Sequence, residues 1–239
     1  MVWSPQLIDL TRPMTKETGI ALAGKMMAEE NPYGEVKVDY LRNWDTDNGM
    51  VCQWTMSDHF GTHLDAPIHI VPGAPTTDKM DIDHCIGDAV VLDLSFANGR
   101  GITAADLEKA NNPKVQPGDI VLLFSNEQPG TLEEWVLSQT YVMPDGAQWL
   151  VDQGAKLVGV EPFGFEHLYE GLFVQDYYNK NTPPPHWPAH TICLSAGVYI
   201  LEGLASLADL VGQRIKFSAL PLPVPESSGS PVRAVAWRD

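Results

Sequence analysis

The chain has 239 residues, of which 44% are hydrophobic and 19% are charged, a balance typical of a folded globular protein. Asp and Glu number 31 against 15 Lys and Arg, so the formal net charge is −16 at pH 7. A field of that sign repels phosphate backbones and anionic lipid head groups. We therefore expect neither a nucleic-acid partner nor a membrane partner.

The cysteines and the N-terminal residues bear on the compartment. Cys52, Cys85 and Cys193 are odd in number and widely spaced, which is typical of free thiols in a reducing compartment. The first residues lack the basic and apolar stretches of a secretory signal. No apolar run reaches the roughly 18 residues that a membrane span needs. The sequence thus predicts a soluble, cytoplasmic protein.

In chain order, an excursion comes first and an alternation of strands and helices follows. Residues 13–50 are polar and turn-rich, so we expect them to leave the core. Short apolar runs rich in β-branched residues predict buried strands at Ala89–Leu94, Ile120–Phe124, Leu157–Val160 and Val198–Leu201. Capping signals predict helices that start near Thr103, at Thr131–Glu134 and at Asp145–Gln153. This alternation predicts an α/β fold, with residues 1–239 as one domain.

Residues that could bind a metal gather in one short segment, Ser57–His69. His59 and His63 lie four apart, with Gly61 between them to permit a tight bend. His63 and Asp65 lie two apart, so in an extended segment both side chains point the same way. Two imidazoles and a carboxylate on one cation leave a position for water. A lone histidine is more often a packing residue, but this pattern, with His69 beyond it, predicts a metal site.

The segment from His59 to His69 resembles the signature of the metal-dependent cyclase family, which includes bacterial kynurenine formamidase and isatin hydrolase. Further matches to this family extend from residue 7 to residue 234, at Leu7–Pro13, Val90–Leu94, Pro188–His190, Ala219–Leu222 and Gly229–Ala234. The resemblance therefore covers nearly the whole chain. It implies a swivelling β/β/α-type α/β fold and a homodimer or higher homo-oligomer.

The resemblance also implies roles for particular residues. His59, His63 and Asp65 would bind one metal, and Asp65 would bridge to a second. His190 and Glu202 would complete the second site, since the family places a Glu twelve residues after that His and this chain keeps the interval. His69 would donate and accept protons. The family resemblance implies one or two Zn²⁺ per chain, with Mn²⁺ possible instead, as in isatin hydrolases.

Several alternatives stay open at this point. Leu201, Leu204, Leu207 and Leu210 recur at helical spacing, which on its own predicts a solvated Glu202, whereas the family interval predicts a ligand. Three further residues, His167, His186 and Trp187, are candidates for lining a pocket or for ordinary packing in a turn.

The expected activity is hydrolysis of a C–N amide bond, in an aryl formamide such as N-formylkynurenine or a cyclic amide such as isatin. A lactone or other cyclic ester is the alternative substrate. A metal-dependent binding protein without turnover is the alternative function. Since binding alone would not require a proton shuttle, His69 favours the amidohydrolase.

Overall fold

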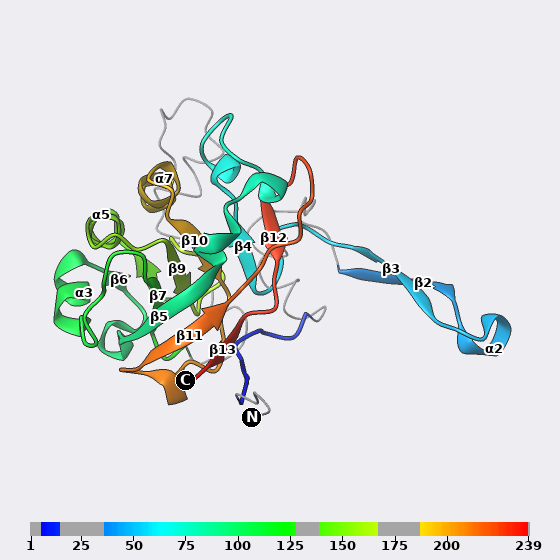
Figure 1. Ribbon diagram of the computed structural model, residues 1–239, viewed down its shortest axis with the longest axis horizontal. Helices are drawn as coiled ribbons and strands as arrows, with labels where there is room; N and C mark the ends of the chain where they lie inside the picture. Colours follow the sequence, from blue (N-terminus) through cyan, green and yellow to red (C-terminus); the bar gives the residue numbers. More distant parts are fainter. Residues whose placement is uncertain (1–5, 15–35, 128–138, 167–186, 239) are drawn as a thin grey trace.

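The computed structural model describes residues 6–14, 36–127, 139–166 and 187–238. Its centre is a nine-stranded sheet with the order β1-β13-β11-β5-β7-β9-β10-β4-β12 (Figure 1). The four middle strands are parallel. They are β5 (Ile86–Asp93), β7 (Ile120–Phe124), β9 (Leu157–Val160) and β10 (Tyr199–Glu202). The four expected strands are therefore all present, with β5 starting earlier and β10 ending one residue later.

The outer strands are antiparallel and complete the sheet on both sides. On one side lie β11 (Arg214–Ser218), β13 (Val235–Trp237) and β1 (Ile8–Asp9). On the other side lie β4 (His63–Asp65) and β12 (Gly229–Pro231). Since β4 pairs with β10, it places the histidine-rich segment next to the last parallel strand.

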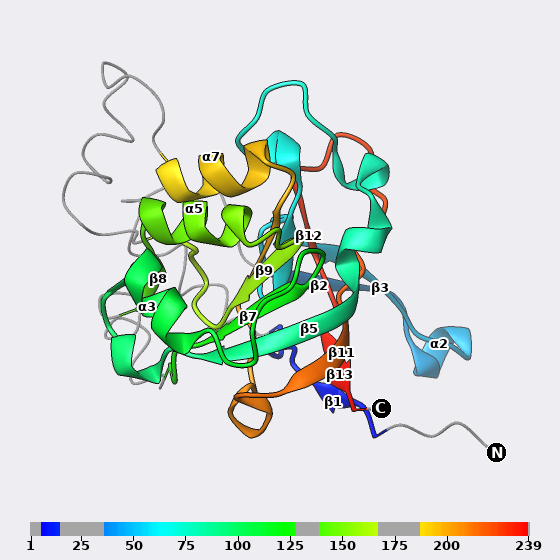
Figure 2. The ribbon, with the colours of Figure 1, turned by 60° about the vertical axis from the view of Figure 1, so that its left-hand side comes forward.

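Both faces of the parallel strands are buried, which explains why these strands are apolar throughout. Alternate residues face opposite sides: Val90 and Leu92 pack with one hydrophobic cluster, Ala89 and Val91 with another. The first cluster lies under three helices, as Figure 2 shows for α5 and α7. These helices are α3 (Ala104–Ala110), α5 (Pro144–Asp152) and α7 (Pro188–Ser195). The α/β prediction is confirmed.

Local signals explain where these helices begin. Thr103 and Asp106 form a reciprocal capping box at the start of α3, as the sequence predicts. Pro144 and Pro188 each occupy the first turn of a helix, where a missing backbone N–H has no cost. The expected helix at Thr131–Glu134 lies outside the described residues.

The four leucines at helical spacing do not form a helix. Leu201 belongs to β10, Leu204 follows the strand, and only Ala208–Leu210 forms a short 3-10 turn. All four leucine side chains are buried in one cluster. Their spacing therefore reflects a strand, an isolated β-bridge at Leu204 and one 3-10 turn. Glu202 is buried, contrary to the prediction that it is solvated.

The part of the expected excursion that the structure describes is a projecting hairpin, which we call the arm (Figure 1). It consists of β2 (Lys37–Arg42), the short helix α2 (Trp44–Asp47) and β3 (Val51–Thr55). The two strands form a sheet of their own. The excursion was expected over residues 13–50; residues 15–35 lie outside the described part of the chain, and the arm continues beyond residue 50 to Thr55.

Two short strands, β6 (Gly101–Ile102) and β8 (Tyr141–Val142), form a third small sheet beside the helices. Among the described residues, no helix is long and apolar enough to cross a membrane. The expectation that residues 1–239 form a single domain stays a prediction.

Candidate metal centre

A tight bend leads into β4 and turns its histidines inward. Gly61 has a φ of +66°, a conformation that favours glycine, so the chain can reverse between His59 and His63. The Nδ1 atom of His63 lies 3.0 Å from the carbonyl oxygen of Gly61. Because a carbonyl only accepts, Nδ1 carries the proton and Nε2 is left to face the interior.

Two later segments bring the other candidate residues to the same place. His190 lies in the first turn of α7, and Glu202 is the last residue of β10. In the antiparallel pairing of β10 with β4, Glu202 stands opposite His63, so the two side chains share one face of the sheet. Sheet topology therefore joins residues that lie far apart in the sequence.

Asp65 is at the centre of this group. Its Oδ1 lies 2.8 Å from Nδ1 of His59 and 3.4 Å from Nε2 of His63, and its Oδ2 lies 3.5 Å from Nε2 of His190. Glu202 lies 3.5 Å from Nε2 of His63 and 3.4 Å from Nε2 of His190. The structure thus brings together all five residues expected as metal ligands.

Each of the three histidines is anchored through one ring nitrogen and turns the other toward a carboxylate. His63 is held by Gly61, His59 Nε2 lies 3.0 Å from Ser228 Oγ, and His190 Nδ1 lies 2.6 Å from a carboxylate oxygen. A neutral imidazole nitrogen that faces a carboxylate needs a proton or a cation between them. Buried imidazoles and carboxylates with this orientation form a donor set that suits a divalent cation such as zinc or manganese.

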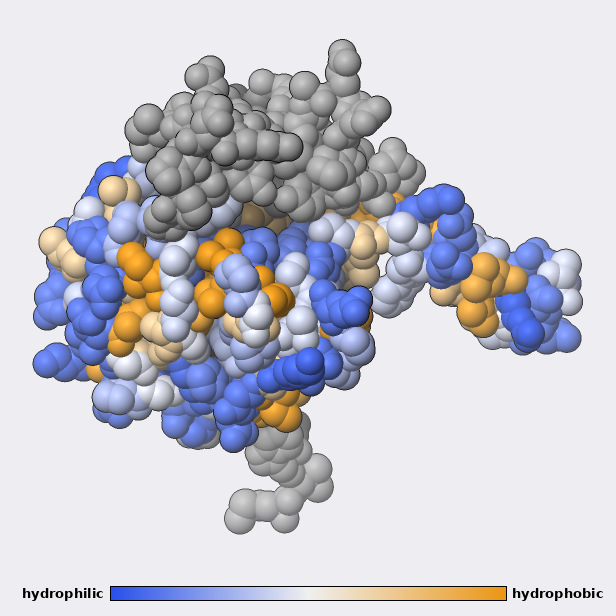
Figure 3. All heavy atoms as spheres, turned by 90° about the horizontal axis from the view of Figure 1, so that it is seen from above, coloured by the Kyte–Doolittle hydropathy of each residue, from blue (hydrophilic) through white to orange (hydrophobic). Residues whose placement is uncertain are grey.

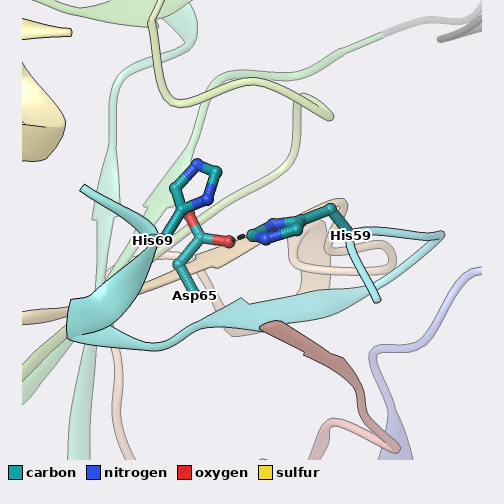
Figure 4. A group of neighbouring side chains, drawn as sticks. All are labelled: His59, Asp65 and His69. Carbon is teal, nitrogen blue, oxygen red and sulfur yellow. Dashed lines mark ion pairs between the residues drawn. The ribbon is translucent and has the colours of Figure 1, made fainter. Parts of the chain in front are cut away.

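Two overlapping groups have ligand atoms within 4.8 Å of one another. One contains His59, Asp65 and His69, and the other contains Asp65, His190 and Glu202. Figure 4 shows the first group, with the Asp65 carboxylate between the two imidazoles. Asp65 is common to both groups, which is the arrangement that a bridging carboxylate requires.

The carboxylates strongly affect the histidines in the metal-free protein. Burial alone would lower the pKa of His63, but hydrogen bonding to Asp65 and the charges of Asp65 and Glu202 outweigh it and raise the pKa to about 9. For His190 burial is likewise outweighed by Asp65, Glu166 and Glu202, and its pKa lies well above 6.5. Without a cation, protons therefore occupy these nitrogens at neutral pH.

His69 differs from the other three histidines. It ends a 3-10 turn (Pro67–His69), and its ring lies 4.1 Å from that of His59 and 5.9 Å from that of His190, between centroids. Among the described residues no group hydrogen-bonds its imidazole, and the residue is exposed. Desolvation by the surrounding protein lowers the pKa of His69 to about 4. The charge of Asp65 raises this pKa, and the neighbouring imidazoles lower it further. His69 is therefore neutral near pH 7.

The model of a protein family described as "Putative cyclase" matches residues 8–167. The chain belongs to the cyclase family. The kynurenine formamidase of Erythrobacter litoralis is 30% identical over 205 residues, which cover 84% of this chain and 85% of that one. That of Geobacillus thermodenitrificans is 30% identical over 207 residues, covering 84% and 88%. The family predicted from the motifs is confirmed, and these relatives support its amidohydrolase class.

The cyclase-family fold is also supported by solved structures. Isatin hydrolase A from Labrenzia aggregata, bound to benzyl benzoate, has a TM-score of 0.79 at 21% identity and covers 98% of this chain and 93% of that one. The isatin hydrolase A of Ralstonia solanacearum has a TM-score of 0.77 at 21% identity, covering 98% and 92%. The predicted fold class is confirmed.

Sequence reasoning missed the residues that anchor the histidines of this cyclase-family site. Glu166 accepts a hydrogen bond from the ring of His190, and Ser228 contacts the ring of His59 while donating to Asp58 at 2.9 Å. Gly229 lies so close to His59 that a Cβ there would meet the ring at 2.9 Å. Asp58 adjoins the histidine motif, but nothing in its spacing indicates a bond to residues at the other end of the chain.

Of the pocket-lining candidates, Trp187 lies within the described residues. The rings of Trp187 and Phe165 lie 5.7 and 5.5 Å from that of His190, between centroids, so aromatic side chains do adjoin the site. His167 and His186 lie outside the described residues.

Proposed function

We propose that this cyclase-family chain is a metal-dependent amidohydrolase that cleaves the C–N bond of an aryl formamide or a cyclic amide. The observation that carries the proposal is Asp65, a buried carboxylate whose two oxygens face different histidines. Similarity to kynurenine formamidases over most of the chain supports amide hydrolysis as the reaction.

In this proposal His59, His63 and Asp65 hold one cation, and Asp65, His190 and Glu202 hold a second. Zinc is our first choice because imidazole and carboxylate ligands suit it, and manganese is the alternative. When bound, such cations polarise a carbonyl group and lower the pKa of water. The chain supplies the negative charge and the fixed orientation of the imidazoles.

His69 moves the proton that hydrolysis requires. The water oxygen bonds to the carbonyl carbon, one proton passes to the leaving nitrogen, and the C–N bond breaks. A neutral imidazole can accept that proton, and its conjugate acid can deliver it to an amide nitrogen, which leaves poorly unless protonated. The low pKa of His69 keeps it in the accepting form at neutral pH.

An aromatic substrate fits the surroundings of the site best. Trp187 is partly exposed beside the ring of His190 and offers a flat apolar surface next to the candidate ligands, whereas the fully buried Phe165 packs near the same ring from the core. A lactone shares the carbonyl group but has an oxygen leaving group, which needs less help from His69.

The decisive experiment combines elemental analysis with activity. Protein purified without chelator is analysed for zinc and manganese, then assayed on N-formyl-aryl amines, isatin and an aryl lactone before chelation, after chelation and after metal is restored. We expect two metals per chain and formamide cleavage that disappears and returns with the metal. Ring opening of isatin by protein with one metal would assign a cyclic amide as the substrate. Preference for the lactone would assign a cyclic ester as the substrate in place of the amide. Absence of both metal and hydrolysis would overturn the proposal.

We further propose that the chain forms a homodimer through the arm. In the β2–β3 pairing, Val38 stands opposite Trp54 and Tyr40 opposite Cys52, so these four side chains share one face. Val38, Tyr40 and Trp54 are 48%, 67% and 63% exposed. Figure 3 shows hydrophobic side chains along the arm. A two-stranded hairpin is only marginally stable alone, so a second copy that covers this face would stabilise it.

Light scattering of the purified protein tests the dimer. Trp54→Lys places a charge on the apolar face, whereas Gln53→Lys places the same charge on the opposite face of β3, next to Asp39 of β2. We expect a dimer for the wild type and for Gln53→Lys, and a monomer for Trp54→Lys. A monomeric wild type, or equal dissociation of both variants, would contradict the proposal.

We also propose a cytoplasmic location. The three cysteines are free thiols, which is typical of proteins in a reducing compartment.

A further inference from the structure

Glu166 is a buried carboxylate just behind the candidate metal centre, in the segment that follows β9. The residue is 4% exposed and both of its carboxylate oxygens accept hydrogen bonds. One oxygen accepts from the backbone N–H of Ala189 at 2.8 Å. The other accepts from the backbone N–H of His190 at 3.1 Å and lies 2.6 Å from the Nδ1 atom of the same residue.

These contacts fix the ring of His190 in two ways. A carboxylate only accepts, so the proton sits on Nδ1 and the opposite nitrogen, Nε2, faces Asp65 and Glu202. The same carboxylate binds two backbone N–H groups in the first turn of α7, which otherwise lack partners within the helix. Ring and backbone are therefore held by one side chain.

The anchors of the other two histidines are uncharged. His63 is held by a backbone carbonyl and His59 by the hydroxyl of Ser228. A carboxylate partner increases the basicity of the ligating imidazole as well as fixing its tautomer. His190 is thus the histidine whose ligand strength depends most on its anchor.

We propose that Glu166 is the positioning residue for His190, fixing its tautomer and orientation so that the second cation position binds tightly. The proposal rests on the proposed two-cation site. It concerns only the half built from His190 and Glu202, because no hydrogen bond in the described part of the chain links Glu166 to His59 or His63.

A matched control lies in the same segment. Glu161 is 5% exposed and its carboxylate accepts from the backbone N–H groups of Ser125 at 2.9 Å and Glu127 at 3.4 Å, but it forms no hydrogen bond with a histidine in the described ranges. Glu161→Gln therefore reproduces the loss of a buried charge and of backbone contacts. It leaves the anchor of His190 unchanged.

Two measurements on the full chain test the inference. Titration of metal-free protein with zinc should show that Glu166→Gln weakens the second equivalent by about 10–100-fold and leaves the first unchanged, while Glu161→Gln binds both like the wild type. Proton NMR of metal-free, ¹⁵N-histidine-labelled protein should show a slowly exchanging, downfield Nδ1–H signal, assigned to His190 by its loss in His190→Gln. This signal should persist in Glu161→Gln and disappear in Glu166→Gln.

The NMR signal separates this inference from the proposed function, because it needs neither metal nor turnover. If the wild type bound a single zinc, the two-cation site would fail, and the Nδ1–H signal would still decide whether Glu166 positions His190. A signal that persists in Glu166→Gln, or equal weakening of zinc binding by both variants, would overturn the inference. Should Glu166→Gln fail to fold, Glu166→Asp retains the charge at a shorter reach and is expected to weaken only the second equivalent.

Discussion

The two halves of the candidate metal centre are built in different ways. His59, His63, Asp65 and His69 come from one short segment, where a glycine bend and a three-residue strand turn them toward each other. Glu202 ends β10 and reaches the site because β10 pairs with β4, whereas His190 reaches it from the first turn of α7, the helix that precedes β10. A local motif thus supplies one half, and the topology of the sheet supplies the other.

Replacing Asp65, which joins the halves, is expected to have the largest effect. Asp65→Asn keeps the shape but removes the negative charge that faces both sets of histidines. We expect loss of both cations and a fall of amide hydrolysis to the background rate. Elemental analysis with a formamidase assay checks this. One retained cation would show that the halves bind metal independently.

Replacing His69 should separate proton transfer from metal binding. His69→Gln removes the titratable ring, and we expect turnover to fall by about 10²–10⁴-fold while the metal content stays unchanged. Single-turnover assays and elemental analysis of the same preparation measure both quantities. Because His69 also belongs to a group of potential ligands, a lost metal equivalent would instead assign it a ligand role.

His63 belongs to the local half but faces Asp65 of that half and Glu202 of the other. The stability of the metal-free protein should therefore depend on pH through the combined effect of these two carboxylates on His63. Its pKa is raised from 6.5 to about 9 in the folded, metal-free protein. The resulting stabilisation is fully present below pH 6.5 and is lost as the pH rises through 9. We expect metal-free protein to lose on the order of 1–3 kcal/mol between these pH values. Denaturant unfolding measures this, and His63→Gln should flatten the profile.

The anchor of His59 should give the smallest effect. Ser228→Ala removes a neutral hydrogen bond, normally worth about 0.5–1.5 kcal/mol, so we expect the first zinc to bind only about 2–10-fold more weakly. The neighbouring Ser227→Ala is the control, because its hydroxyl also donates to Asp58 but does not contact His59. Equal effects from both serines would mean that loop stability, not the anchor, controls the affinity.

The sequence was most informative where structure is local. Four apolar runs identified the parallel strands, since strands buried on both faces need continuous apolar residues. The spacing of His59, His63 and Asp65 predicted that these side chains lie together, because a bend at Gly61 and a short extended stretch are local features. The distant half needed the family interval between His190 and Glu202, because no local pattern encodes the pairing of β4 with β10.

Other features could not be predicted because they depend on tertiary contacts. The four leucines from residue 201 to residue 210 have helical spacing, but they lie in a strand, a bridge and a 3-10 turn region. What they have in common is burial in one hydrophobic cluster. Glu166 and Ser228 carry no motif, since an anchor needs only an acceptor that the fold brings within reach. The sequence did not predict the apolar face of the arm, because the strands that form it are short and are separated in the chain by α2.

The approach of Gly229 to His59 has a consequence for protein engineering. A methyl group at this position would meet the imidazole at 2.9–3.1 Å, so even alanine must displace the ring. A single carbon atom on the edge strand β12 can therefore shift the ring of a candidate metal ligand without replacing any residue that hydrogen-bonds to that ring. Variant libraries that aim to change the substrate should therefore keep residue 229 as glycine, because any larger residue there would move the ring of His59.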